Sequence, residues 1–125
     1  MRHLLRLVRM KAVGTAGGSG RAEAYEFVIP LDGHGRLDTW MWHEERGACT
    51  VKRIDAGRLQ RIGMLTQRHD GMWAFSYGLS DADDEVLPKF NAQPFVVGRS
   101  VAVVDTDNRS CGYEIVEVGP AIVLE

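Results

Sequence analysis

Hydrophobic and polar positions alternate through much of the chain, and the clearest alternation covers residues 24–31. Tyr25, Phe27 and Ile29 fall on one side of an extended backbone, and the residues between them fall on the other. A period of two is typical of a half-buried β-strand. Pro30 predicts that this strand ends at a sheet edge or a turn, because proline cannot donate to the ladder.

A second strong pattern covers residues 57–78, where two β-like runs flank the dipeptide Asp70-Gly71. Asp-Gly between such runs favours a two-residue type I′ turn, so we expect a β-hairpin. The return strand carries an aromatic side chain at every second position: Trp73, Phe75 and Tyr77. Such a row predicts one core face of a strand, and a ligand-stacking platform is the alternative.

The remaining segments predict one helix and further short strands. Asp38 is placed to cap a helix over residues 39–45, which Gly47 ends. Trp40 and Trp42 fall on different faces of that helix, so we expect one of them to be exposed. Further strands are expected at residues 48–54, on both sides of residues 105–110, and after Pro120.

Many short strands with turn signals between them predict an all-β fold. We expect a small, partly open barrel or sandwich with one short helix and a flexible N-terminal segment. The fourteen glycines and three tryptophans agree with many tight turns around a few bulky core residues. With 125 residues, the chain is long enough for one domain whose core needs no disulfides.

Residues 1–23 differ in character from the rest. One helical face of the first turns is apolar and another is basic, formed by Leu4, Leu5 and Val8 and by Arg2, Arg6 and Arg9. The arginines interrupt the apolar run that a secretory signal needs, and residues 14–24 have the composition of a flexible linker. We therefore expect a basic leader and Gly-rich linker over residues 1–23, followed by a single β domain over residues 24–125.

Two roles for the leader stay open at this point. Residues 1–12 have the two-faced pattern of a segment that makes weak contact with an anionic membrane surface or fills a partner groove. The other interpretation is a disordered leader, with Met10 in place of Met1 as the functional start.

Net charge narrows the classes of partner, and cysteine content narrows the cellular compartment. The net charge is −2, and the first acidic residue is Glu23, so the region after the leader is acidic. Affinity for nucleic acid depends on neutralising phosphates, so we do not expect nucleic-acid binding. The chain lacks the roughly 18 consecutive apolar residues of a transmembrane helix. Cys49 and Cys111 form no CxxC motif and predict reduced thiols in a bacterial-type cytoplasmic protein.

Three stretches, residues 27–40, 73–85 and 95–118, together resemble a group of small uncharacterised bacterial β-rich proteins. In that group a strand ends in Pro-(Leu/Val)-Asp, a Trp-aromatic strand leads into an acidic loop, and a Phe-x-x-Gly-x-x-Val hairpin follows. The resemblance covers residues 25–120, and the sequence departs from the pattern around Gly98. It implies domain boundaries and no activity.

The densest acidic stretch is Asp-Ala-Asp-Asp-Glu at residues 81–85. A calcium-binding loop that begins at Asp81 requires Gly at its sixth position and Glu at its twelfth, where Val86 and Ala92 stand. Carboxylates used for acid–base catalysis require burial or a partner that separates their pKa values. Adjacent acids in a loop more often stay solvated, so the pattern predicts a solvated turn and no metal site.

A basic run lies in residues 52–68, with Asp55 as its one acid. Its arginines Arg53, Arg58 and Arg61 are the candidates for an anion-binding stripe on neighbouring strands. The alternative is a solvated outer face whose charges pair with acids across the sheet. The possible zinc ligands, His34, His43 and Cys49, do not have the spacing of a known zinc motif.

These patterns favour a non-catalytic binding or assembly module that needs no cofactor and acts through an unknown protein partner or by self-association. The alternative is a small enzyme or ligand-binding protein with a site assembled from distant residues. That site would use either the strand residues Arg58 and Arg61 or the acidic loop at residues 81–85. A deep pocket with convergent polar groups distinguishes the second possibility from the first.

Overall fold

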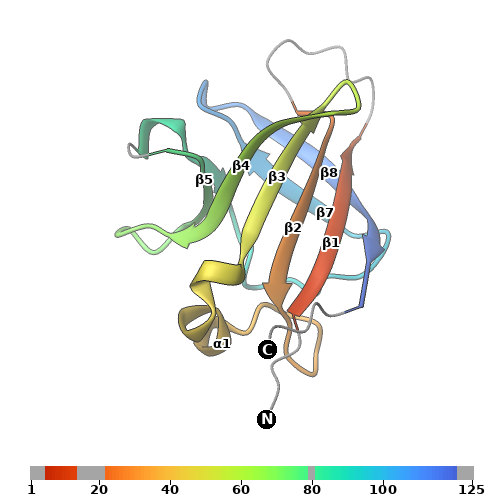
Figure 1. The fold of residues 1–125 in the computed structure, drawn as a ribbon, viewed down its shortest axis with the longest axis vertical. Coiled ribbons are helices and arrows are strands. Elements are labelled where there is room, and N and C mark those ends of the chain that lie inside the picture. Colours follow the sequence, from red (N-terminus) through yellow and green to blue (C-terminus); the bar gives the residue numbers. More distant parts are fainter. Residues whose placement is uncertain (1–4, 14–21, 79–80, 121–125) are drawn as a thin grey trace.

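The computed structural model describes residues 5–13, 22–78 and 81–120. Within these ranges the chain forms an eight-stranded barrel in which consecutive strands pair antiparallel and the first strand pairs with the last (Figure 1). The elements are β1 (Leu5–Ala12), β2 (Ala24–Pro30), α1 (Thr39–Glu44), η1 (Arg46–Ala48), β3 (Thr50–Asp55), β4 (Arg58–Gln67), β5 (Trp73–Ser76), η2 (Asp81–Asp83), β6 (Glu85–Leu87), β7 (Ser100–Val104) and β8 (Ser110–Val118). The all-β barrel with one short α-helix is confirmed, and the barrel is closed.

The first strand corrects the prediction that residues 1–23 lie outside the domain. Leu5–Ala12 is a strand that pairs with β2 on one side and β8 on the other. Val8 and Met10 are fully buried in the core. The backbone groups at the edges of β2 and β8 need partners, and β1 satisfies both edges, which outweighs a weak helical pattern. Residues 1–4, most of the predicted linker (14–21), and the predicted strand after Pro120 (121–125) lie outside the described residues.

The predicted helix and its cap are confirmed. The Asp38 side chain accepts a hydrogen bond from the Met41 backbone N–H at 3.0 Å, which satisfies one free donor of the first turn. Trp42 is 7% exposed and donates its indole N–H to the Leu65 carbonyl at 3.1 Å, whereas Trp40 is 67% exposed. The helix therefore covers one end of the barrel with one of its two tryptophans.

The hairpin between β4 and β5 is confirmed, but its turn is not type I′. That turn needs two consecutive residues with positive φ, and only Gly71 has one here (φ 87°). The Arg68 carbonyl accepts from the Gly71 N–H, and the Met72 carbonyl accepts from the Arg68 N–H, which makes a longer loop. The hairpin with two consecutive positive φ values joins β3 to β4, where Ala56 (φ 53°) and Gly57 (φ 73°) form the turn.

Aromatic side chains fill the barrel interior. Phe27 on β2 contacts the Phe75, Phe90 and Phe95 rings, with centroids 5.4 to 6.2 Å apart. Trp73 and Phe75 are at most 2% exposed, so the alternating aromatic row is a core face, as predicted, and not a stacking platform. The packing changes in character toward the end of the barrel opposite α1, where Tyr25 and Tyr77 bring hydroxyl groups into the interior.

Candidate functional site

A carboxylate lies inside the barrel near the end opposite α1. Glu85 is the first residue of β6 and pairs with Phe75 of β5, so both side chains face the interior. Its side chain is 3% exposed and forms an ion pair with Arg53. The Tyr25 hydroxyl donates to Glu85 Oε1 at 2.9 Å, and the Tyr77 hydroxyl donates to the same oxygen at 2.7 Å.

Strand register brings these partners together from across the barrel. Arg53 on β3 lies opposite Tyr25 on β2, so it faces inward, and its side chain is 14% exposed. Its Nε donates to Gln60 Oε1 at 2.8 Å, beside a register shift between β3 and β4. Arg53, Glu85, Tyr25 and Tyr77 are called the buried polar cluster below. Each of its members is held by at least one other member.

The electrostatics of the buried polar cluster keep both phenols protonated. Burial raises the pKa of Tyr25 and of Tyr77 far above the usual range, and the neighbouring Glu85 charge raises each pKa further. Burial lowers the pKa of Arg53, but the Glu85 carboxylate and the neighbouring tyrosines together outweigh burial, so that pKa is raised. The two phenols therefore act as fixed hydrogen-bond donors to a carboxylate that Arg53 also balances.

The buried polar cluster forms part of the wall of a small polar cavity of about 200 Å³, called the polar mouth below. Its lining comes from β3, β4, the η2–β6 segment and the β7–β8 turn: Arg53, Gln60, Arg61, Asp83, Glu85, Asp105, Thr106 and Asp107. Glu85 is buried and Arg53 is half-buried, whereas the side chains around them are more exposed. Segments distant in sequence thus converge on one cavity.

Local backbone geometry fixes the walls of the polar mouth. Asp105 Oδ1 accepts from the backbone N–H groups of Asp107 and Arg109, both at 2.9 Å, which holds the β7–β8 turn. The Arg61 guanidinium lies over the Tyr77 ring, 5.8 Å from its centroid. A Cβ at Gly63 would lie 2.7 Å from Tyr77 Cδ1, so only glycine at this position lets β4 pass so close to that ring.

The three arginines predicted as anion-binding candidates lie in different surroundings. Arg53 faces inward and Arg61 lines the polar mouth, but Arg58 lies opposite Asp55 beside the β3–β4 turn and is exposed. Arg53 and Arg61 lie opposite each other on neighbouring strands, and Arg58 lies apart from them, so the three arginines do not form one stripe. Glu85 is the partner of Arg53 that the sequence pattern did not indicate.

The acidic loop is only partly a solvated turn. Asp83 is exposed, but Asp84 is 8% exposed and Glu85 is 2% exposed, so the prediction is wrong for these two residues. Glu85 is buried because β6 begins there and pairs with β5, which the polar composition of the loop concealed. Among the described residues, the buried Asp84 Oδ1 has no hydrogen-bond partner.

Sequence reasoning also missed the hydroxyls of Tyr25 and Tyr77. Tyr25 lies on an apolar strand face as predicted, and Tyr77 directly follows the last residue of β5, but a pattern of alternation treats tyrosine as one more apolar residue. The available signal was that a buried tyrosine needs a partner for its O–H. An acidic residue at the start of a strand was the natural acceptor.

The candidate zinc ligands do not come together in one site. His34 and His43 are exposed, while Cys49 is fully buried. Among the described residues no group of three or more His, Cys, Asp or Glu side chains is arranged to hold a metal ion. Both cysteines are free, and burial raises the pKa of the Cys49 thiol to about 12, with Glu45 adding to the effect.

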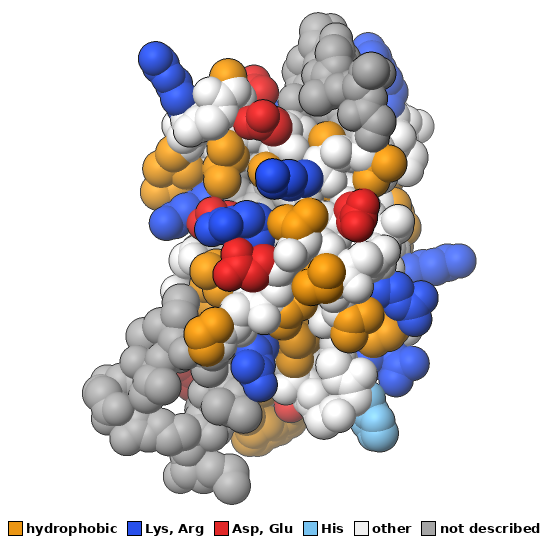
Figure 2. All heavy atoms as spheres, turned by 90° about the vertical axis from the view of Figure 1, so that its right-hand side faces the viewer, with side chains coloured by type: hydrophobic (Ala, Val, Ile, Leu, Met, Phe, Trp, Pro, Cys, Tyr) orange, Lys and Arg blue, Asp and Glu red, His pale blue; other side chains and the backbone are white. Residues whose placement is uncertain are grey.

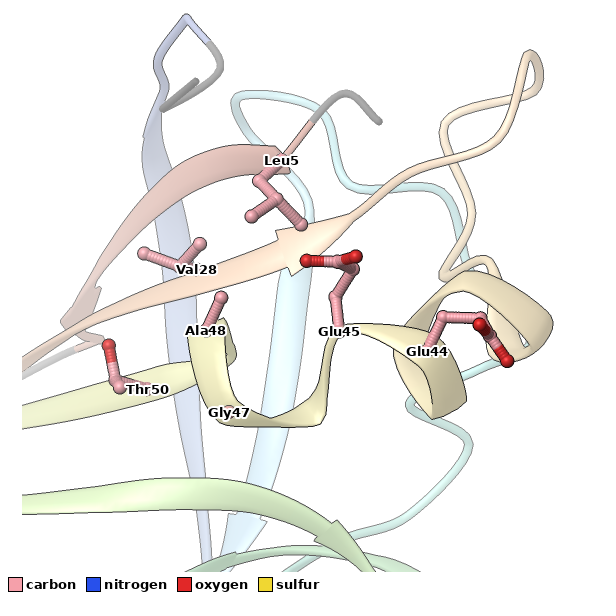
Figure 3. A pocket seen from close by; sticks show the side chains of 7 residues that line it. All are labelled: Leu5, Val28, Glu44, Glu45, Gly47, Ala48 and Thr50. Carbon is pink, nitrogen blue, oxygen red and sulfur yellow. The ribbon is translucent and has the colours of Figure 1, made fainter. Parts of the chain in front are cut away.

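A larger cavity of about 530 Å³ lies outside the barrel wall beside α1 and η1 (Figure 3). Its apolar side chains come from Leu5, Val28 and Ala48, and the carboxylates of Glu44 and Glu45 project beside them. It is an open groove, and its described lining is mostly apolar apart from these two carboxylates and Thr50.

Apolar side chains also reach the surface near β8. Val96 and Val97 are 48% and 63% exposed, and Val116 is 38% exposed. Figure 2 shows that the face seen there mixes hydrophobic side chains with charged ones. Scattered apolar groups are a normal part of protein surfaces, so this face by itself does not define an interface.

Comparisons with protein families, with curated proteins and with solved structures find no match to this chain. The resemblance to small bacterial β-rich proteins therefore stays a prediction. In the described part of the chain, the helices lack the length and apolar character of a membrane span.

Proposed function

We propose that the protein is a non-catalytic binding module and that the polar mouth is its binding site for a small hydrophilic solute. The observation that carries the proposal is the convergence of polar side chains from four separate segments on one cavity of about 200 Å³. Binding sites place a few polar groups to fix the orientation of a ligand. Pockets for drug-sized ligands span about 300–1,000 Å³, so this volume suits a smaller solute.

The state of the buried groups supports binding without catalysis. A general base needs a pKa near the working pH, and the raised pKa of Tyr25 and Tyr77 keeps both phenols protonated. The Cys49 thiol, with a pKa of about 12, is not an activated nucleophile. The oxygens of Glu85 accept from two hydroxyls and face a guanidinium, so this carboxylate serves to hold the cavity in shape.

The free thiols support the expected cytoplasmic location. Cys49 and Cys111 form no disulfide with each other, which suits a reducing compartment. Fractionation of the native host followed by detection of the chain would test the location, and recovery in a secreted fraction would contradict it.

A thermal-shift screen of small hydrophilic metabolites against the full chain tests the binding function. Ligands that bind only the native state raise Tm, by an amount that grows with concentration above Kd. The matched variant is Thr106→Trp, which places a bulky ring at the rim of the polar mouth. We expect at least one compound to raise Tm of the wild type and to have no effect on this variant.

Two results would overturn the proposal. One is a complete screen without any shift in Tm. The other is a compound that shifts the wild type and Thr106→Trp equally, because it would bind elsewhere. Trp40→Ala serves as the control for a change in tryptophan content, since Trp40 is exposed on the helix at the other end of the barrel.

A further inference from the structure

The charges of the polar mouth are not all balanced by one another. Arg53 and Glu85 form an ion pair and neutralise each other in the buried part of the cavity. Asp107 has a distant partner in Arg109, with 3.7 Å between Oδ2 and the guanidinium. Asp105 is engaged by the β7–β8 turn through its Oδ1. Arg61 and Asp83 are the two remaining charged residues of the lining.

Within the described part of the chain, the side chains of Arg61 and Asp83 form no hydrogen bond or ion pair with another residue. The Arg61 guanidinium lies over the face of the Tyr77 ring, which leaves its five N–H donors unused. Asp83 likewise presents an unused carboxylate from η2. One cavity therefore carries an unpaired cation on β4 and an unpaired anion on η2.

We propose that the polar mouth binds a small zwitterion with a carboxylate and a primary ammonium group, as in a free α-amino acid. This inference rests on the proposed binding function. The ligand carboxylate binds Arg61, whose planar guanidinium matches a carboxylate through two parallel hydrogen bonds. The ligand ammonium group binds Asp83, because an ammonium supplies three donors to a carboxylate acceptor.

The two charges explain why neither a simple anion nor a simple cation fits equally well. An anion that pairs with Arg61 brings its charge into a cavity with Asp83, Asp105 and Asp107 in the lining. A cation that pairs with Asp83 leaves Arg61 without a partner, and Arg61 lies beside Arg53 in the strand register. A zwitterion pairs with both Arg61 and Asp83 and adds no net charge to the cavity.

Calorimetric titration of the full chain with the common free α-amino acids tests the inference. Each amino acid is compared with its N-acetyl derivative, which lacks the ammonium charge, and with its amide, which lacks the carboxylate. We expect at least one free amino acid to bind, and both blocked forms to bind about tenfold to a hundredfold more weakly. Blocked forms that bind as tightly as the free amino acid would overturn the zwitterion.

Substitutions of Arg61 and Asp83 test which charged group of the ligand each residue binds. Arg61→Gln should weaken the free amino acid by at least about tenfold and leave the weak binding of the amide unchanged. Asp83→Asn should weaken the free amino acid similarly and leave the weak binding of the N-acetyl form unchanged. The matched controls are Arg58→Gln and Asp55→Asn, which remove the same kinds of charge from residues of the β3–β4 hairpin outside the lining of the cavity. Controls that weaken binding as much as the test variants would overturn the assignment.

The outcomes separate this inference from the binding function on which it rests. If no amino acid binds but another hydrophilic compound binds the wild type and not Thr106→Trp, the zwitterion is wrong and the binding function stands. If no compound of either set binds, both are wrong. If Arg61→Gln and Asp83→Asn bind like the wild type, an amino acid that binds does so at another place, and the zwitterion site is wrong.

Discussion

At the α1 end of the barrel, Trp42 packs edge-on against Trp73 with ring centroids 4.7 Å apart, and Phe90 packs against Phe95 at 4.9 Å. At the other end, Glu85 accepts two tyrosine hydroxyls and pairs with Arg53. The first end is filled by aromatic rings, and the second contains charged groups and hydroxyls that bond one another.

The two ends differ in what their burial contributes. Burial of aromatic surface is favourable and tolerant of small changes in geometry. Burial of an ion pair gains little net stability, because the desolvation cost offsets the attraction, and loss of either partner is costly. The α1 end therefore accounts for stability, while the polar end sets the position of particular groups around the polar mouth.

The largest expected effect belongs to the aromatic end. Trp73 is 2% exposed, and Trp73→Ala should lower the free energy of unfolding by about 3–5 kcal/mol or prevent folding, because it leaves a cavity against Trp42. Urea denaturation followed by circular dichroism measures the loss. Trp40→Ala is the control and should cost less than about 0.5 kcal/mol. Equal costs for the two variants would contradict the division between core and surface.

At the polar end, Arg53→Met should cost about 3 kcal/mol, because it leaves the Glu85 carboxylate buried without a counter-charge. This is the lower part of the range for a broken buried pair, since the Arg53 side chain keeps 14% exposure. The double variant Arg53→Met with Glu85→Leu should recover most of that loss, since no charge is left unpaired. A double variant less stable than Arg53→Met would show that the ion pair itself contributes net stability.

Alkaline pH should act on the polar end through its phenols. The pKa values of Tyr25 and Tyr77 are raised in the folded state, so the unfolded chain loses these protons first, and stability falls as pH rises above the ordinary value of 10.0. Each phenol contributes up to about 1.4 kcal/mol per pH unit in that window. The Cys49 thiol adds a similar loss from about pH 9 to about pH 12.

Urea denaturation at a series of pH values measures this slope. The variant Tyr25→Phe with Tyr77→Phe should show a shallower fall of stability above about pH 10 than the wild type, because it has two fewer buried phenols to ionise on unfolding. The buried thiol is present in both proteins, so the comparison isolates the phenols. Identical slopes in the two proteins would contradict the raised pKa values.

The smallest expected effect concerns the rim of the polar mouth. Arg61 is exposed and has a ring contact but no ion pair among the described residues, so Arg61→Gln should change the free energy of unfolding by less than about 0.5 kcal/mol. The same variant is expected to bind the free amino acid at least about tenfold more weakly. A change in stability as large as that of Arg53→Met would place Arg61 with the buried cluster.

Local patterns were sufficient to predict several elements. The alternation of Tyr25, Phe27 and Ile29, the Asp38 cap and the Asp70-Gly71 hairpin signal each depend on residues close in sequence. Period, capping and turn chemistry operate over a few residues, so they can be read without knowledge of the fold. The same reasoning placed Trp73 in the core and one tryptophan of α1 on the surface.

Long-range pairing decided the rest. Leu5–Ala12 has a weak helical pattern of its own, and it is a strand because the edges of β2 and β8 both need a partner. Glu85 has the composition of a solvated loop, and it is buried because β6 pairs with β5 at that residue. In both segments the backbone hydrogen bonds of the sheet outweigh local preference.

The polar mouth shows most clearly a feature that long-range pairing decided. The sequence determined that Arg53, Arg61 and the acidic residues 81–85 exist and which strands carry the arginines. Only closure of the barrel decided that β3 and β4 face η2 and the β7–β8 turn across one cavity. The contact between Arg53 and Glu85 joins residues 32 positions apart, and no local propensity acts over that distance because such a contact depends on the order and register of every strand between them.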